Sequence, residues 1–334
     1  MTGAVIRGGG AAAYGSAYLL RKGGVKVTVQ RSGRARLPVL MLSDAARSLI
    51  QDVFEEPELF CGSHRIRKRI VAWGKDAEPR VLEHSATVVS EEELLQSLGS
   101  HIDFDDDDDG ARSNWSILSS PPIPVATIEQ RFGSRTAAAM KVTLRPGADS
   151  SACWIEALEQ GWLFLIPNTA GAGWLLSVGQ PPGVLLAESR LVRMQILGRG
   201  SCCSEFPAYP RILSPLCGAG WLACGTTAMA FDPICGDGTA HAIREAILAA
   251  AVIRSASEGE DVPSLLNHYE ARLTAGFARH LELCLNFYRS GFGGPWWEKE
   301  AESLEQGIRW CARQSVSFSE YRYRLSGFEL RAAG

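Results

Sequence analysis

The sequence lacks the features of membrane-spanning, secreted and nucleic-acid-binding proteins. No apolar run approaches the ~20 residues of a membrane helix, and the first residues enter a glycine-rich segment at once, leaving no room for a cleavable signal. A net charge of -3 over 334 residues gives no reason to expect a basic nucleic-acid-binding face. The densest basic run, residues 65–69, is short and fits a strand or helix edge. We therefore expect a cytoplasmic protein with no membrane span and no nucleic-acid partner.

Disulfide and metal-binding patterns are missing as well. The nine cysteines form no CxxC pair and no zinc spacing, so we predict reduced thiols, as in a cytoplasm. The adjacent Cys202 and Cys203 would form only a strained disulfide and are interpreted as two ordinary thiols near a loop. Residues 105–109 are five consecutive aspartates without the alternating positions and distant Glu of a calcium loop. We expect them in a solvated loop and predict no metal site.

Two glycine-rich segments lie at opposite ends of the chain. The first, residues 8–13, stands between a short apolar run and an amphipathic helix; the second, residues 231–239, opens another apolar helix. A strand, a glycine turn and a helix together direct backbone N–H groups and a positive helix end at a phosphate. The pair predicts a dinucleotide that lies across the fold, with its phosphates at one segment and its ring end at the other.

The residue patterns elsewhere indicate two kinds of structure. Valines alternate along residues 25–29 as in a strand, residues 39–60 look helical, and residues 91–98 form a helix that begins after Ser90 as N-cap. From 123 to 192, short alternating segments broken by Gly and Pro predict an antiparallel sheet with one face over a ligand pocket.

The chain then returns to alternating strand and helix. Residues 221–224 read as a strand, the following helix extends to about residue 255, and the last 70 residues have helical spacing. The predicted fold is α/β, with a Rossmann-like nucleotide-binding domain, an inserted antiparallel substrate sheet and a helical C-terminus. The predicted divisions are 1–120 with 195–257, then 121–194, then 258–334.

Three passages resemble the FAD-dependent oxidoreductases of the p-hydroxybenzoate hydroxylase fold. They are the N-terminal glycine loop, the strand 162–167 and residues 225–238, and the resemblance spans roughly residues 3–255. The branches it resembles are the flavin monooxygenases, the tryptophan-halogenase-like enzymes and the quinone-cofactor maturases. The resemblance implies that the nucleotide domain binds FAD. It also implies an organic substrate or a partner protein, with a flavin reductase or NAD(P)H as electron donor.

The same resemblance assigns cofactor contacts in two sets. One set would face the FAD pyrophosphate: Gly8, Gly10, Ala12 and Ala13. The other would lie near the flavin ring, where a helix N-terminus stabilises negative charge at flavin N1 and C2=O: Pro233, Gly236, Asp237, Gly238 and Thr239.

Three side chains that anchor FAD in this family are replaced. Arg31 stands where the second strand usually ends in Glu, which holds the adenosine ribose; Arg accepts no hydrogen bond but could meet a phosphate. Gly225-Thr226 replaces a Gly-Asp pair that holds the ribityl chain, and Glu91 falls near a usual Arg. Each lost charge-assisted bond would weaken FAD binding by ~1.5–3 kcal/mol, so we expect FAD to be held weakly.

The leading functional prediction is an FAD-dependent oxidoreductase of monooxygenase type that acts on an aromatic or other organic substrate, or on a protein side chain. The alternative is a degenerate member of the fold that serves as a scaffold or assembly partner. A flavin-dependent halogenase is a minor alternative. Its catalytic Lys would lie four residues before Trp73, where Arg69 stands, and the adjacent Lys68 would point elsewhere on a strand.

The sequence assigns no catalytic residue. His241 would lie near the flavin edge and assist proton transfer, or it is a hydrogen-bonded core histidine. Asp237 is either a base or a carboxylate that stabilises a helix N-terminus. Four aromatic residues either line a substrate face or fill the sheet core: Trp154, Trp162, Phe164 and Trp174.

Overall fold

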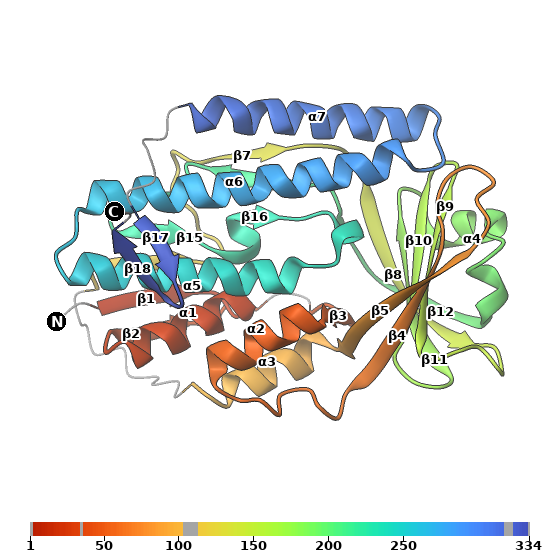
Figure 1. Cartoon of the computed structure of the whole chain (residues 1–334), viewed down its shortest axis with the longest axis horizontal. Helices are drawn as coiled ribbons and strands as arrows, with labels where there is room; N and C mark the ends of the chain where they lie inside the picture. Colours follow the sequence, from red (N-terminus) through yellow and green to blue (C-terminus); the bar gives the residue numbers. More distant parts are fainter. Residues whose placement is uncertain (1–2, 34–35, 103–112, 317–322, 333–334) are drawn as a thin grey trace.

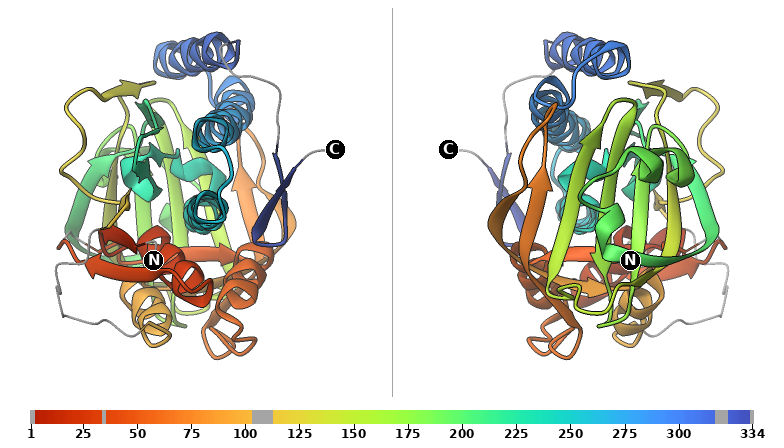
Figure 2. Two further views of the ribbon diagram at one scale, coloured as in Figure 1. Left: turned by 90° about the vertical axis from the view of Figure 1, so that its left-hand side faces the viewer. Right: turned by 90° about the vertical axis from the view of Figure 1, so that its right-hand side faces the viewer.

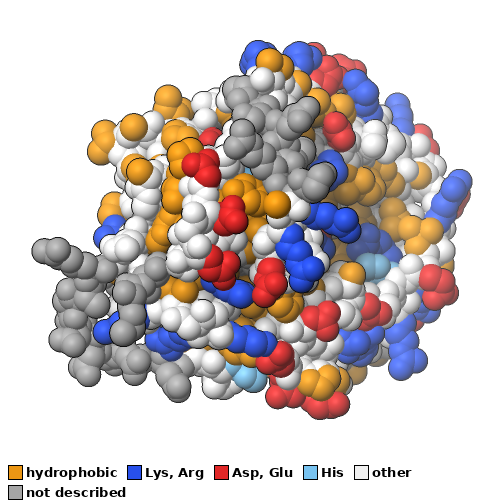
Figure 3. All heavy atoms as spheres, turned by 60° about the vertical axis from the view of Figure 1, so that its left-hand side comes forward, with side chains coloured by type: hydrophobic (Ala, Val, Ile, Leu, Met, Phe, Trp, Pro, Cys, Tyr) orange, Lys and Arg blue, Asp and Glu red, His pale blue; other side chains and the backbone are white. Residues whose placement is uncertain are grey.

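The computed structural model describes residues 3–33, 36–102, 113–316 and 323–332. The aspartate run at 105–109 lies outside these residues, as do the side chains of Cys202 and Cys203. On the face drawn in Figure 3, acidic and basic side chains are mixed and form no large field of one sign. Within the described ranges, no helix is long and apolar enough to cross a membrane.

A five-stranded sheet joins the two ends of the chain. Its order is β14 (Cys217–Gly218), β15 (Trp221–Ala223), β6 (Trp115–Leu118), β1 (Gly3–Arg7) and β2 (Lys26–Gln30). β1 pairs in parallel with β2 and β6, and β15 pairs in parallel with β6. The first glycine motif directly follows β1, and Gly225 comes two residues after the end of β15, so the parallel pairing brings these two turns to the same edge of the sheet.

A large eight-stranded sheet forms the other side of the molecule (Figures 1 and 2). Its order is β12 (Ile196–Pro207), β8 (Thr136–Leu144), β11 (Ala172–Val178), β10 (Gly161–Pro167), β9 (Ala152–Leu158), β4 (His64–Ala72), β5 (Arg80–Val89) and β3 (Leu40–Ser43). All neighbouring strands are antiparallel except β4 and β9. The antiparallel strands expected between residues 123 and 192 are confirmed for β8 to β11, whereas residues 128–131 form a strand of another sheet. The eight-stranded sheet also takes strands from residues 40–89 and 196–207, outside that range.

The remaining elements connect and cover these two sheets. The helices are α1 (Ala11–Lys22), α2 (Asp44–Phe54), α3 (Glu91–Gly99), α4 (Pro182–Glu188), α5 (Gly238–Ser257), α6 (Val262–Arg289) and α7 (Pro295–Ser315). A three-stranded sheet has the order β16 (Met229–Ala230), β13 (Arg211–Ser214), β7 (Ile128–Arg131). Short 3-10 turns are η1 (Arg193–Gln195), η2 (Gly225–Thr227) and η3 (Pro233–Cys235). The predicted α/β class with an antiparallel sheet and a helical C-terminal region is confirmed.

Two local predictions need correction. Residues 40–43 form β3 rather than helix, because Ser43 is the N-cap of α2 and its hydroxyl accepts the Ala46 N–H at 3.1 Å. The C-terminal region is not all helix, since β17 (Tyr323–Ser326) and β18 (Glu329–Ala332) form a hairpin. The predicted start of α3 is confirmed: Ser90 and Glu93 form a reciprocal capping box.

Candidate functional site

The site is built around α1 and α5, which lie side by side and run in the same direction (Figure 1). A Cβ built on Gly15 would lie 3.1 Å from the Cβ of Ala246, so the two backbones approach closely. Further along, Gly23 at the end of α1 packs against the Arg254 side chain near the end of α5. Since the contacts advance along both helices together, both N-termini lie at one end of the pair.

The first glycine motif is a tight turn that leaves the start of α1 uncapped. Gly8 has φ +136°, and a Cβ there would lie 2.8 Å from Ser119 Cβ, so only glycine fits. Gly10 is the N-cap of α1; no side chain caps this end and its first turn holds no acidic residue. The positive end of α1 is therefore uncompensated by side chains, as at an anion-binding helix terminus.

Arg36 adds a cation at this turn that the sequence patterns did not single out. Its guanidinium donates to the Gly9 carbonyl oxygen at 2.9 Å. Ala12 and Ala13 have buried side chains, so only their backbone could face a phosphate. Their small size lets α1 pack against the segment that carries Gly225, whose Cβ would lie 3.0 Å from Ala12 Cβ.

The second glycine motif is open where the first is tight. Gly236 has φ +64°, and a Cβ at Gly236 or Gly238 would meet nothing within 4 Å. Asp237 is the N-cap of α5 but makes no capping bond, and the first turn holds no acidic residue. Its carboxylate instead accepts the Arg244 guanidinium at 2.8 Å. This end of α5 is open around Gly236 and Gly238, while the Asp237 carboxylate at its N-cap offsets part of the positive charge of the helix terminus.

The three residues that stand in place of the usual FAD anchors either make contacts within the protein or are exposed to solvent. Glu91 is buried, and its carboxylate accepts the Leu37 N–H at 2.7 Å while its own N–H donates to the Leu37 carbonyl. It fastens the segment before β3 rather than pointing at a ligand. Arg31 directly follows β2 and is exposed, and Thr226 is exposed within η2.

A buried carboxyl group lies behind the second motif. Glu245 of α5 accepts the Gly225 N–H at 2.6 Å, and burial raises the pKa of this carboxyl to about 8. The available sequence signal is a glutamate inside an otherwise apolar helical run. Glu245 holds η2, including Gly225 at φ +66°, against the start of α1.

An ionic cluster lies beneath the flavin-end turn η3. Asp232, directly before Pro233, accepts the Arg135 guanidinium at 2.6 Å and the Tyr288 hydroxyl at 3.0 Å. Arg135 also donates to the Glu300 carboxylate, and its guanidinium lies 4.5 Å from the centre of the Tyr288 ring. All four side chains are buried. The cluster ties η3 to α6 and α7, a link that no sequence spacing indicated.

The four aromatic residues do not share one face. Trp154 packs in a second core with Leu163 and Leu165, while Trp162 and Phe164 belong to the main core on the opposite face of the sheet. Trp162 donates its indole N–H to Tyr288 at 3.3 Å. Trp174 pairs with Ile166 across β10 and β11, on the Phe164 side, and is half-buried. Of the four, Trp174 alone has partial exposure on the side of the main core.

The two basic residues considered for halogenation lie on opposite faces of β4. Lys68 pairs with Asp149 at 2.6 Å, on the face of the second core. Arg69 lies beside His84 at 3.2 Å, and its register partner Cys153 belongs to the main core. No lysine therefore occupies the position four residues before Trp73 on that face.

His241 is held beside Phe231, with ring centroids 4.2 Å apart in a stacked arrangement. Burial lowers the pKa of this imidazole to about 4, so the ring is neutral at physiological pH. Its Nε2 lies 3.8 Å from the Asp237 carboxylate. The position at the start of α5 agrees with that expected from the sequence, while its part in proton transfer stays a prediction.

The residues present fit FAD at two of its parts. The open α1 terminus with Arg36 suits a pyrophosphate, and the unobstructed space at Gly236 and Gly238 suits approach of a flavin ring to α5. The site has no acidic side chain to hold the ribose at position 31, where Arg31 stands. The site therefore suits an FAD held mainly by backbone groups and helix ends.

The chain has the p-hydroxybenzoate hydroxylase fold, because solved structures of this fold superpose along nearly its whole length. The peptidyl tryptophan dihydroxylase QhpG, essential for tryptophylquinone cofactor biogenesis, matches 99% of this chain and 86% of its own, with TM-score 0.75 and 17% identity. The flavin-dependent halogenase CmlS matches 95% of this chain and 72% of its own, with TM-score 0.73 and 17% identity.

A third structure, Klebsiella pneumoniae HpxO complexed with FAD and uric acid, matches 96% of this chain and 94% of its own, with TM-score 0.62 and 14% identity. No protein-family model and no curated protein matches the sequence. The likeness thus defines the fold, and the chemistry has to be argued from the site.

Proposed function

We propose that this protein is an FAD-dependent oxidoreductase of monooxygenase type. The observation that carries the proposal is the pair of parallel helices α1 and α5, whose N-termini lie at one end without acidic residues in their first turns. The Asp237 carboxylate at the α5 N-cap is paired with Arg244. Such termini attract negative charge. Two of them side by side suit a ligand with a pyrophosphate at one end and an anionic ring at the other.

Each motif has a distinct task in this proposal. Backbone N–H groups at the start of α1, with the Arg36 guanidinium, hold the pyrophosphate, and Thr226 supplies one hydroxyl contact to the ribityl chain. The start of α5, from Gly236 to Thr239, faces the flavin ring beside Pro233 and favours negative charge there. Bound FAD would supply two-electron transfer and, once reduced, reaction with O2.

The substrate side of the proposal rests on the large sheet. Trp174, half-buried on the side of the main core, offers an aromatic contact to an organic substrate or to a side chain of a partner protein. A flavin reductase or NAD(P)H would supply the electrons. The proposal places the protein in a reducing compartment, the cytoplasm, where cysteines stay as thiols.

FAD titration of matched variants tests the proposal. Arg36→Ala removes a cation beside the phosphate turn and is expected to weaken FAD binding about tenfold. Arg309→Ala, at an exposed position on α7, is the control and should leave affinity unchanged. Thr226→Asp supplies the carboxylate typical of this fold and should tighten binding about tenfold.

The two alternatives give different results. A chain that takes up no FAD, in wild type or in Thr226→Asp, refutes the enzyme and leaves the scaffold role. Halogenation is disfavoured because Lys68 is paired with Asp149 on the far face of the sheet. Chloride-dependent modification of an aromatic compound that is abolished by Lys68→Ala would reverse that judgement.

A further inference from the structure

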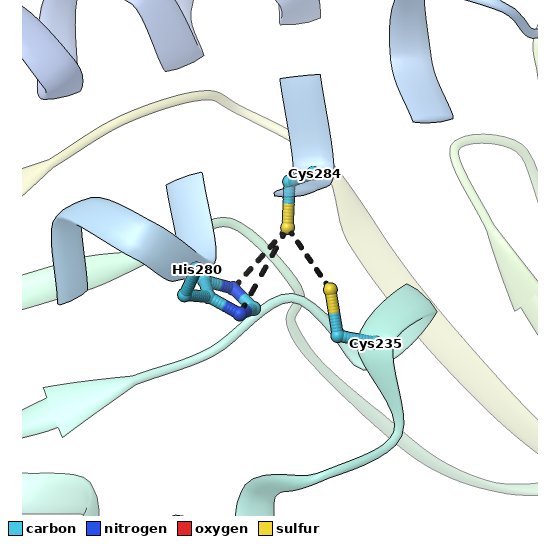
Figure 4. A group of neighbouring side chains, drawn as sticks. All are labelled: Cys235, His280 and Cys284. Carbon is cyan, nitrogen blue, oxygen red and sulfur yellow. Dashed lines mark hydrogen bonds between the residues drawn. The ribbon is translucent and has the colours of Figure 1, made fainter. Parts of the chain in front are cut away.

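Three side chains with metal-binding atoms meet between η3 and α6. Cys235 comes from η3, and His280 and Cys284 come from α6 (Figure 4). Their potential ligand atoms all lie within 4.8 Å of one another. The two Sγ atoms are 3.5 Å apart, and the Cys284 Sγ lies 3.3 Å from His280 Nε2 and 4.0 Å from Nδ1.

The fold brings these three residues together. His280 and Cys284 are four residues apart on α6, which puts them on one face of the helix, one turn from each other. Asp232, the residue directly before η3, donates its N–H to His280 Nε2 at 2.9 Å. The Asp232 carboxylate is held in turn by Arg135. The Tyr288 hydroxyl also donates to this carboxylate. Cys235 is therefore presented to the helix by a turn that is held through the Asp232 side chain, an anchor that does not depend on His280.

We propose that Cys235, His280 and Cys284 bind one zinc ion. Two thiolates and one imidazole are ligands that Zn²⁺ favours, and three protein ligands with an open fourth position are the arrangement found in catalytic zinc sites. A tetrahedral ion with bonds of about 2.3 Å to sulfur and about 2.0 Å to nitrogen separates its ligand atoms by roughly 3.5–3.8 Å. The two Sγ atoms, 3.5 Å apart, and Cys284 Sγ with His280 Nε2, 3.3 Å apart, are close to these values. Cys235 Sγ and the imidazole nitrogen lie within 4.8 Å of each other, so the largest shift falls on this pair.

The surroundings suit a neutral metal centre. Two thiolates balance the charge of the ion, which matters because His280 and Cys284 are buried. Phe231 packs edge-on against His280 with ring centroids 4.7 Å apart, which shields that side from water. Cys235 is only half-buried, so the fourth position opens outward on its side and takes a water molecule.

One hydrogen bond has to yield to the ion. His280 Nε2 accepts the Asp232 N–H at 2.9 Å, and an imidazole nitrogen has one lone pair. Zinc at Nε2 replaces this acceptor contact, and Nδ1 then carries the ring proton. The ion would link η3 to α6 directly, so the link now made by a hydrogen bond becomes a coordination bond.

Cobalt substitution tests the site without depending on FAD. The chain is purified under reducing conditions, stripped with a chelator and titrated with Co²⁺. The expected result is thiolate-to-cobalt charge-transfer absorption with d–d bands of tetrahedral intensity, saturating at about one ion per chain and lost on adding one equivalent of Zn²⁺. Zinc should also raise the thermal midpoint of the stripped protein.

Two alanine variants localise the ligands. Cys284→Ala removes a proposed ligand and should abolish the charge-transfer band and the stabilisation by zinc. Cys311→Ala changes another buried cysteine, on α7, and should preserve both. Absence of the bands while all thiols titrate as free, or bands that persist in Cys284→Ala, overturns the proposal. So does isolation of Cys235 and Cys284 as a disulfide that excludes both metals.

Discussion

At the scale of single residues, the site depends on a carboxyl group that no ligand would touch. Glu245 is 3% exposed and receives the Gly225 N–H at 2.6 Å. Its pKa is raised to about 8 because burial disfavours the charged form. The folded chain thus keeps a proton on Glu245 over a pH range in which the unfolded chain has lost it.

This difference makes folding stability fall with rising pH. The unfolded carboxyl has a pKa of about 4.3, so between about pH 5 and pH 8 the folded state binds more protons, and stability decreases by up to about 1.4 kcal/mol per pH unit. Glu245→Gln should remove this slope, so that its stability relative to wild type improves steadily toward pH 8. Urea unfolding at several pH values measures it. Glu302→Gln, at an exposed position, should keep the wild-type slope; an unchanged slope in Glu245→Gln would contradict the account.

At the scale of elements, the close approach of α1 and α5 sets the spacing of the two helix ends. Gly15 faces Ala246 and Ile243, and Gly225 faces Ala12, without room for larger side chains. Burying two helices against each other at this distance needs small residues at the contact. The phosphate turn and the flavin-end turn are therefore positioned by the same interface.

Gly15→Val should separate the two helices. The added side chain overlaps Ala246, and overpacking of this kind costs about 1–3 kcal/mol. FAD binding should weaken together with stability, because the two helix ends no longer match one ligand. Thermal unfolding and FAD titration measure the two effects. Gly276→Val, on α6 where a Cβ meets only the end of Arg279 at 3.9 Å, should change stability by less than about 0.5 kcal/mol and leave binding unaltered.

The elements at the site follow from local sequence patterns. The alternating valines of β2, the Gly8 turn, the Ser90–Glu93 capping box and the strands of the 123–192 region are all short-range signals, and the structure confirms them. The clusters that join distant segments are different. Cys235 and Cys284 are 49 residues apart, and Arg135 and Glu300 are 165 residues apart.

Tertiary packing alone brings such residues together, so spacing could not reveal them. Part of a signal was present, since His280 and Cys284 stand four residues apart on a helical pattern. β3 was missed because four residues are too few to show a strand period beside a helix that begins at once.

At the scale of the whole molecule, α6 and α7 connect the five-stranded sheet to the eight-stranded sheet, with contacts to the turn η3 of the second glycine motif. α6 extends from the small parallel sheet toward the large sheet, with α7 packed on it (Figure 1). Four buried side chains connect these elements. Arg135 directly precedes β8, Asp232 precedes η3, and Tyr288 and Glu300 lie on α6 and α7. The C-terminal helices thus position the flavin-end turn.

Removing one charge from this cluster should destabilise the whole chain. Glu300→Ala leaves the buried Arg135 without one of its two carboxylate partners, which costs about 3–5 kcal/mol for a buried ion pair. Glu305→Ala, which removes the ion pairs of Glu305 with Arg289 and Arg309 near the surface, should cost less than about 1 kcal/mol. Denaturant unfolding measures the free energy of unfolding of both variants. An equal loss in the two would show that the buried cluster stabilises the chain no more than a surface ion pair does.

The central claim is that one dinucleotide spans the two helix ends. Equilibrium binding of FAD, FMN and ADP to the purified chain tests it most directly, because FMN and ADP each carry only part of FAD. The account predicts saturable uptake of about one FAD per chain, with an affinity at least about tenfold higher than for FMN or ADP. Absence of saturable FAD binding, or FAD bound no more tightly than FMN or ADP, would contradict it.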